Sequence, residues 1–274
     1  MFWSLKIDKL STLADFRPDD GDEVIIDLDA APLPELLTYL QAEHFPAEKI
    51  RVALPLITRT AALSGDEVEE VARRIKILRA AGWQKFLAAQ LGQLPWLNGA
   101  DIAADWSLYA ANSAAIEFLR GQGVRRFTAS PEDDAENLRA LLAGAGDALQ
   151  VIVYQDSPLF IAEPCARAAW QKCPRHDEPC HGEPCHGEPQ PLATRGGQKF
   201  ALLTDRCRST VINDAPFSWS EHLPQLRDYG LQKARVDFTY RRYEPAAAKI
   251  LWQRIKNGET LAGTHSGNFR RGWQ

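Results

Sequence analysis

The side chains best suited to chemistry in this sequence are cysteines, and they are gathered in one stretch. All five cysteines of the 274-residue chain fall there, as Cys165, Cys173, Cys180, Cys185 and Cys207. Thiols that only fill a core would be scattered along the chain, so this clustering predicts a common cause. A metal ion, an iron–sulfur cluster and disulfides are the three candidates.

The spacing of the cysteines favours an iron–sulfur cluster, with zinc as the alternative. The intervals between successive cysteines are 7, 6, 4 and 21 residues, and no C-x2-C pair is present. Zinc modules usually carry short paired knuckles, whereas a cluster accepts thiolates from separated positions. Cys180 and Cys185 each precede a His-Gly-Glu-Pro unit, and this duplication means that only one of the two is needed as a ligand. The candidate replacement ligands are His176, His181 and His186.

Composition and compartment count against disulfides. Hydrophobic residues make up 45% of the chain and charged residues 25%, as in an ordinary globular protein. A core of this size needs no disulfide cross-links to fold. No charged-then-apolar leader opens the sequence and no apolar run is long enough to span a membrane. We therefore expect a cytoplasmic protein, in which disulfides do not persist.

The charge is distributed unevenly. The net charge of −4 argues against a general nucleic-acid binder. From Arg195 onwards, however, 14 Lys and Arg face 7 Asp and Glu. This basic third predicts an anionic ligand, and a solvated basic face is the equally ranked alternative.

The elements that must position these residues alternate between strand and helix. Continuous apolar runs such as Val24–Ile26 and Val151–Val153 are typical of strands that are buried on both faces. We expect helices from a cap at Ser64 with Glu67 as its capping-box partner, over Ser113–Gly121, from Ser130-Pro131, over Ser220–Gly230 and over Pro245–Lys256. The expected strands are Phe2–Ile7, Glu23–Leu28, Arg51–Leu56, Gln84–Ala89, Asp101–Asp105, Arg125–Ala129, Leu149–Tyr154 and Lys233–Phe238.

Eight strands that alternate with helices predict an α/β fold of the (β/α)8 TIM-barrel type, with an open doubly wound sheet as the alternative. We expect one domain over residues 1–274, with a cysteine-rich insertion over residues 155–218 after the seventh strand. A loop that follows a barrel strand lies at the C-terminal face, where barrel enzymes build their active sites.

Polar residues at the ends of the expected strands would meet on that same face. Each also has a structural interpretation, which we favour about two to one for any single residue: Asn112 and Ser130 as helix caps, Asp27 and Asp29 as turn formers, and Arg235 with Asp237 as a pair inside the barrel. The remaining members of this set are Arg59, Asp105, Ser107, Glu132, Tyr154 and Gln155.

Several ordered segments resemble peptidase family U32, the collagenase-like group. They are Ala104–Leu108 with Asn112-Ser113, Gly123–Glu132, Tyr154–Pro158, Leu203–Arg208 with Ile212-Asn213, Arg235–Thr239 and Thr264–Gly272. Tyr109 departs from the family, which usually has Asn at that place, and the duplicated His-Gly-Glu-Pro-Cys unit is atypical. Larger relatives carry more chain, so we expect either one domain of a longer protein or a short paralogue.

The resemblance implies a barrel with a four-cysteine 4Fe–4S site, held by Cys165, Cys173, one of Cys180 or Cys185, and Cys207. Relatives include oxygen-independent hydroxylases of RNA bases and of ubiquinone, some of which work with a second subunit of the same family. Arg206, Arg208, Arg235 and Arg270 would hold an anionic small molecule or an RNA phosphate. The full set of substrate-binding candidates is Asp105, Asn112, Arg206, Arg208, Asn213, Arg235, Asp237, His265 and Arg270.

Three functions follow as hypotheses. The first is an iron–sulfur enzyme that hydroxylates an RNA base or a quinone-type molecule. The second is a metal-dependent peptidase, as the family name suggests, although no His/Glu site with a general base is legible in the sequence. The third is a non-catalytic partner subunit with a structural cluster. No catalytic residue is singled out by the sequence.

Overall fold

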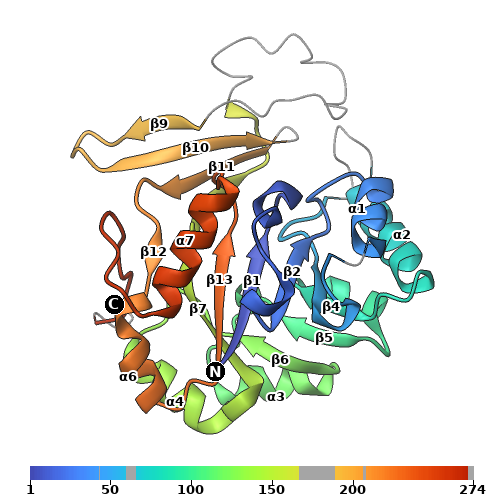
Figure 1. The fold of residues 1–274 in the computed structure, drawn as a ribbon, viewed down its shortest axis with the longest axis horizontal. Coiled ribbons are helices and arrows are strands. Elements are labelled where there is room, and N and C mark those ends of the chain that lie inside the picture. The colour runs from blue at the N-terminus through green and yellow to red at the C-terminus, as the bar shows by residue number, and fades with distance from the viewer. Residues whose placement is uncertain (43, 60–65, 167–188, 206–207, 271–274) are drawn as a thin grey trace.

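Eight parallel strands close into a barrel, as the alternating pattern predicts. The computed structural model describes residues 1–42, 44–59, 66–166, 189–205 and 208–270 (Figure 1). Neighbouring strands pair in the order β7-β13-β1-β2-β3-β4-β5-β6, and β6 pairs again with β7, which closes the ring. The open doubly wound alternative is therefore wrong, because the sheet between β7 and β6 has no free edge.

Each strand begins and ends within three residues of its expected bounds. The barrel strands are short, and their positions that face the helices are largely apolar, as is required of strands that are covered by helices outside. The barrel strands are β1 (Phe2–Ile7), β2 (Glu23–Asp27), β3 (Ile50–Ala53), β4 (Lys85–Ala88), β5 (Asp101–Ala104), β6 (Val124–Thr128), β7 (Leu149–Gln155) and β13 (Lys233–Phe238).

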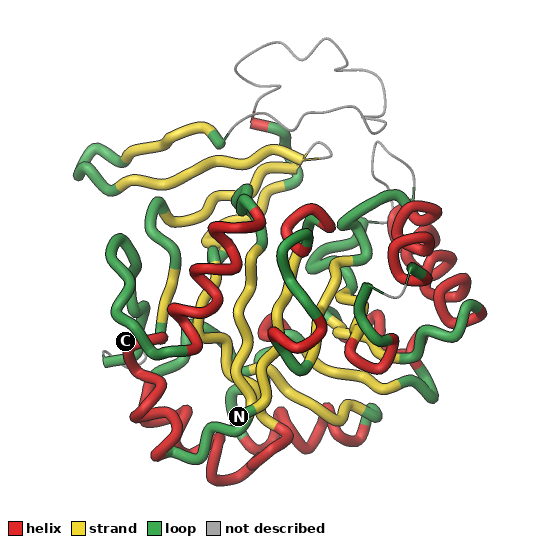
Figure 2. The backbone as a smooth tube through the Cα atoms, viewed as in Figure 1, coloured by secondary structure: helices red, strands yellow, loops and turns green. Residues whose placement is uncertain are grey.

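Helices surround the barrel (Figure 2). They are α1 (Leu33–Gln41), α2 (Glu67–Ala80), α3 (Ser113–Gly121), α4 (Ala135–Ala145), α6 (Leu223–Asp228) and α7 (Pro245–Lys256). The predicted bounds of α3 and α7 are confirmed, and the expected helix from Ser220 is a 3-10 turn followed by α6. Among the described helices, none is both long enough and apolar enough to cross a bilayer.

Two helix starts were predicted wrongly, for the same physical reason. Asp66, and not Ser64, caps α2 by accepting from the backbone of Val68 and Glu69, and Ser64 lies outside the described residues. Asp134 caps α4 in the same way, so that helix begins at Ala135 and not at Ser130-Pro131. In both places an Asp directly precedes the first helical residue, where its carboxylate accepts from the free N–H groups of the first turn.

A four-stranded antiparallel sheet interrupts the barrel after β7. It has the order β8-β11-β10-β9, and its four strands lie within residues 155–218, the range of the predicted insertion. Figure 1 shows it at the end of the barrel towards which β13 and β1 point, which is the C-terminal mouth. Its strands are β8 (Pro158–Ala162), β9 (Gln190–Ala193), β10 (Lys199–Asp205) and β11 (Arg208–Asn213), and a short β12 (Phe217–Ser218) then returns alongside β7.

Alternation along the strands separates two kinds of packing. On β1, Leu5 and Ile7 face outward into the main core under the helices, whereas Ser4 and Lys6 face the lumen. The lumen has its own small apolar layer, formed by Ile25, Ala53, Leu87 and Ala103. Charged side chains fill the lumen on both sides of this layer, so the barrel is held partly by buried ion pairs.

The lower charged layer is centred on Glu23. Its carboxylate accepts from Arg51 Nε at 2.9 Å, Arg126 Nη1 at 2.6 Å and Ser4 Oγ at 3.0 Å. Burial opposes the charge on Glu23, but the two guanidinium groups outweigh it and hold the Glu23 pKa below its usual value. These bonds tie β1, β2, β3 and β6 together across the lumen.

We predict that Glu23→Gln lowers the free energy of unfolding by about 3–5 kcal/mol, because it removes the buried carboxylate that Arg51 and Arg126 share and leaves Asp101 as the remaining carboxylate partner of Arg51. Chemical denaturation measures this loss. The matched control is Glu70→Gln, which breaks an exposed pair with Arg73 on α2 and should change stability by less than about 1 kcal/mol. Equal effects of the two substitutions would contradict the structural role of the lower layer.

Candidate functional site at the barrel mouth

Three of the predicted site residues meet at the upper end of the lumen, where Arg235 is fully buried. Its Nη2 atom lies 2.8 Å from Asp105 Oδ1, and its Nε and Nη2 atoms lie 2.7 and 2.8 Å from the two oxygens of Asp237. A bidentate carboxylate on one side and a second carboxylate on the other satisfy the guanidinium. The predicted pairing of Arg235 with Asp237 is therefore confirmed, and Asp105 joins it from β5.

Lys6 extends this network towards the open end of the barrel. Its Nζ atom donates to Asp105 Oδ2 at 3.0 Å and lies 3.7 Å from Asp27 Oδ1. Burial disfavours the ammonium, but the carboxylates of Asp105 and Asp27 outweigh burial and raise the Lys6 pKa above its ordinary value. Asp105 shows the reverse case: burial is opposed by Arg235 and Lys6, which together lower the Asp105 pKa.

Asp27, at the end of β2, is the most accessible carboxyl group of this set. Its side chain is 28% exposed, compared with 4% for Asp105 and 3% for Asp237. Burial raises the pKa of Asp27 to about 7; Lys6 opposes this rise, and the carboxylates of Asp8, Asp29 and Asp105 add to it. A carboxyl group that titrates near neutral pH can both give and take a proton.

The rim around Asp27 is braced by further contacts. Arg74 on α2 donates to Asp29 Oδ1 at 2.7 Å, so both groups are tied to the rim. The backbone N–H of Tyr240 donates to Asp8 Oδ2 at 2.7 Å. Tyr240 adopts a left-handed backbone with φ of 68°, and Tyr109, which follows β5, does the same with φ of 47°. Non-glycine residues in this region are strained, and such strain is concentrated at functional sites.

A second buried group lies beside β7. Asp156 is fully buried, accepts from the Tyr243 hydroxyl and forms an ion pair with Arg241. Tyr243 in turn lies 3.4 Å from the hydroxyl of Tyr154. Burial raises the Tyr154 pKa to about 12 and raises the Asp156 pKa as well. This group fixes the chain that leaves β13 against both ends of the insertion, because Arg241 pairs with Asp156 at its start and donates to the carbonyl of Asn213 near its end.

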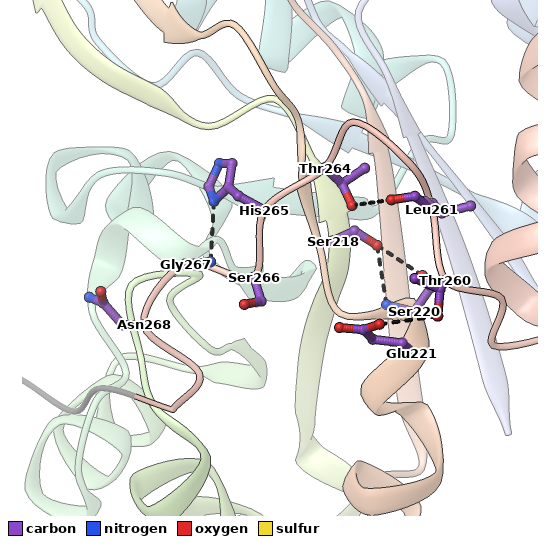
Figure 3. Close-up of a pocket in the computed structure, with 10 residues that line it drawn as sticks. All are labelled: Ser218, Ser220, Glu221, Thr260, Leu261, Thr264, His265, Ser266, Gly267 and Asn268. Carbon is purple, nitrogen blue, oxygen red and sulfur yellow. Dashed lines mark hydrogen bonds between the residues drawn. The ribbon is translucent and has the colours of Figure 1, made fainter. Parts of the chain in front are cut away.

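A polar cavity of about 520 Å³ opens next to this group (Figure 3). The predicted residue His265 lines it, and its Nδ1 atom accepts from the Gly267 N–H at 3.1 Å. Asn213, another predicted residue, contacts His265, with its Nδ2 atom 3.1 Å from His265 Nε2. Burial lowers the His265 pKa, and the charge of Asp156 opposes it. Most hydroxyl groups in the cavity already bond to protein atoms, as Ser218 does with Ser220.

The insertion sheet contacts the rim of the barrel through Arg208. Arg208 Nη2 lies 3.0 Å from Glu67 Oε2, and Glu67 also pairs with Arg59, which follows β3. Glu67 is therefore an inter-element contact and not the capping-box partner that the sequence suggested. The Arg208 Nε atom is buried and has no hydrogen-bond partner among the described residues.

The remaining predicted residues do not gather at the mouth. Asn112 caps α3 by accepting from the Ala115 N–H, so its structural interpretation is confirmed. Arg270 is exposed near the end of the described chain. Cys165 is half-buried. Cys173, Cys180, Cys185, Cys207 and Arg206 lie outside the described residues, as do His176, His181 and His186.

Within the described ranges, no three His, Cys, Asp or Glu side chains converge as metal ligands. The barrel mouth itself is thus built from ion pairs. Its groups that are suited to proton exchange or to ligand binding are Lys6 and Asp27, with Arg235 and Asp105 behind them.

Lys6 is the functional candidate that sequence reasoning missed. A usable signal was present, because Lys6 follows Ser4 at the period of two on the polar face of an otherwise apolar strand. Asp27 belongs to the set of polar residues at strand ends but not to the predicted substrate-binding residues, since an Asp at a strand end is usually a turn former.

Comparisons with known proteins give no family. No protein-family model matches the sequence, and no curated protein matches it. Among solved structures, the putative copper homeostasis protein CutC from Streptococcus agalactiae is 14% identical with a TM-score of 0.42, over 56% of this chain and 86% of its own. The spore cortex-lytic enzyme SleL from Bacillus megaterium is 9% identical with a TM-score of 0.40, over 96% of this chain and 75% of its own. The barrel is defined here by its own strand pairing, independently of these distant likenesses.

We predict that Asp27 makes the stability of the protein fall as pH rises. Its folded pKa lies above the unfolded value of about 3.9, so its contribution is fully present below that value and is lost as pH rises through about 7. The free energy of unfolding, measured by denaturant titration between these limits, should depend less steeply on pH in Asp27→Asn.

The control for this slope is Asp15→Asn, which removes an exposed carboxylate on the connection between β1 and β2. It should keep the wild-type slope. A wild-type slope in Asp27→Asn as well would show that Asp27 titrates alike in the folded and unfolded chain.

Proposed function

We propose that this protein is an iron–sulfur enzyme of the oxygen-independent hydroxylase type, which acts on an RNA base or a quinone-type small molecule. The ligands of a 4Fe–4S cluster would be Cys165, Cys173, one of Cys180 or Cys185, and Cys207. The clustering of the thiols in sequence supports the cluster, and the resemblance to peptidase family U32 supports the reaction class.

The observation that carries the proposal is the side chain of Ser209. Its Oγ atom accepts from the Ala166 N–H at 2.8 Å and donates to the Pro164 carbonyl at 2.8 Å, so it holds both neighbours of Cys165. Ser209 lies two positions after Cys207 in the sequence. The chain segments that carry the first and last cysteines are thus bonded to each other, as a shared inorganic centre requires.

The sheet pairing is consistent with the same arrangement. Asp205 and Arg208, the described residues that flank positions 206–207, pair with each other across β10 and β11. Ser209 pairs with Ala162 on β8. Both ends of the cysteine-rich stretch therefore leave the same end of one sheet. The half-buried Cys165 suits a thiolate ligand, which needs access to the metal and partial shelter from water.

Arg208 supports an anionic substrate. It lies on β11, one residue after Cys207, and its buried Nε atom lacks a hydrogen-bond partner among the described residues. A guanidinium donor of this kind suits a phosphate or a carboxylate. Arg235, by contrast, is fully engaged by Asp105 and Asp237, so its role is to support the site and not to hold the substrate.

We predict that anaerobically purified protein is brown, absorbs broadly at about 400 nm, and contains iron and acid-labile sulfide. Cys165→Ser should lose most of the iron, because a cluster rarely survives without one of its thiolates. Iron and sulfide analysis of the folded variants measures this. A colourless protein loaded with zinc would contradict the cluster, and chelator-sensitive cleavage of gelatin would favour the peptidase alternative.

The duplicated unit provides a matched pair of variants. We predict that only one of Cys180→Ser and Cys185→Ser loses iron, because a four-thiolate site uses one of the two. Full iron retention in both single variants, together with retention in Cys165→Ser, would remove the cysteines from the site. Activity that arises only with a second chain would assign this protein to the partner-subunit class.

A further inference from the structure

We propose that Lys6 and Asp27 form an oxyanion site at the barrel mouth, in which the ammonium group and the carboxyl group together bind the carbonyl oxygen of a substrate. This goes beyond the proposed function. It depends on the proposed function only for the identity of the carbonyl compound, because the site itself requires no cluster.

The geometry leaves these two groups available while their neighbours are saturated. Asp105 accepts from Lys6, from Arg235 and from the Trp106 N–H. Asp237 is bidentate with Arg235. Asp27, by contrast, has only the long 3.7 Å contact with Lys6, and no hydrogen bond to its carboxyl oxygens is present within the described part of the chain.

Lys6 retains donor capacity as well. An ammonium has three N–H donors, and one is used on Asp105 at 3.0 Å. The Lys6 side chain is 12% exposed and that of Asp27 is 28% exposed, so both reach the open end of the lumen. Two donors within 3.7 Å of each other can converge on one oxygen atom.

The surrounding charges explain why Asp27 carries a proton near neutral pH. Burial is the main cause of its raised pKa of about 7. Asp8 from the end of β1, Asp29 from the β2 rim and Asp105 after β5 add to it, and Lys6 opposes them. From β13, Arg235 is neutralised by its own two carboxylates, so it does not restore the Asp27 charge.

Asp8 provides an independent sign that the mouth is built for a ligand. Its Oδ1 atom is buried and has no hydrogen-bond partner among the described residues, although Oδ2 is bonded to Tyr240. Burial also raises the pKa of Asp8. A buried carboxyl oxygen without a partner costs free energy, which a hydrogen-bond donor of a bound ligand, and not its carbonyl oxygen, would recover.

The chemistry of the two donors selects the ligand class. A neutral acid and an ammonium both donate, so they favour an oxygen that gains negative charge, as in the enolate or phenolate form of a ring carbonyl compound. Quinones and pyrimidine bases both carry such carbonyl groups. An amine or a metal cation would instead require Asp27 to be ionised.

The test uses 2,4-dinitrophenolate as the probe, a phenolate that stays ionised and coloured throughout the neutral pH range. Wild-type protein should bind it below pH 7 and lose affinity about tenfold for each pH unit above the Asp27 pKa of about 7. Asp27→Asn should bind with an affinity that does not change with pH, since the amide donates a hydrogen bond at every pH.

Asp15→Asn is the control, because it also removes one carboxylate but lies exposed on the connection between β1 and β2, outside the set of charges that act on Asp27. It should keep the wild-type pH profile. Circular dichroism confirms that each variant is folded. Absence of saturable binding, or a pH profile in Asp27→Asn that equals the wild-type profile, would overturn the proposal. Loss of the cluster in iron analysis would leave it standing, so the two proposals fail separately.

Discussion

The buried guanidinium of Arg235 imposes the main constraint on this structure. A cation inside a barrel lumen is costly to desolvate unless carboxylates surround it with good geometry. Asp237 on the same strand and Asp105 on β5, across the barrel, supply that geometry. The opposite sides of the barrel are therefore held together by charge, in addition to the main core beneath the helices.

This constraint determines the character of the mouth. Arg235 contacts Asp105 from below and already balances much of its charge. The ammonium of Lys6 lies above Asp105, and Asp27 balances its charge only in part. Asp27 then lies among carboxylates at the accessible end of the network. The same interaction that stabilises the barrel thus leaves one carboxyl group ready to exchange a proton. The insertion sheet stands over this end, with Ser209 holding the segment that carries Cys165 (Figure 1).

Much of the fold could be predicted from the sequence, because each barrel strand is a short apolar run between turn signals. The lumen could be predicted less well. Arg235 and Asp237 were identified as a pair from their spacing, but the cross-barrel contacts with Asp105 and Lys6 depend on closure and register, which local patterns do not encode. The predicted starts of α2 and α4 were wrong, because Asp66 and Asp134, and not the nearby serines, cap these helices. The convergence of the thiols stays a prediction, since four of the five lie outside the described residues.

Carbon-detected NMR of the side-chain carboxyl of Asp27 tests the central claim most directly. The account predicts a titration midpoint near 7 for Asp27, with the Asp105 carboxyl still ionised at every pH where the protein is folded. A midpoint for Asp27 near the ordinary value of about 3.9 would contradict it. In that case the mouth would be a closed set of ion pairs without a group that exchanges protons at neutral pH.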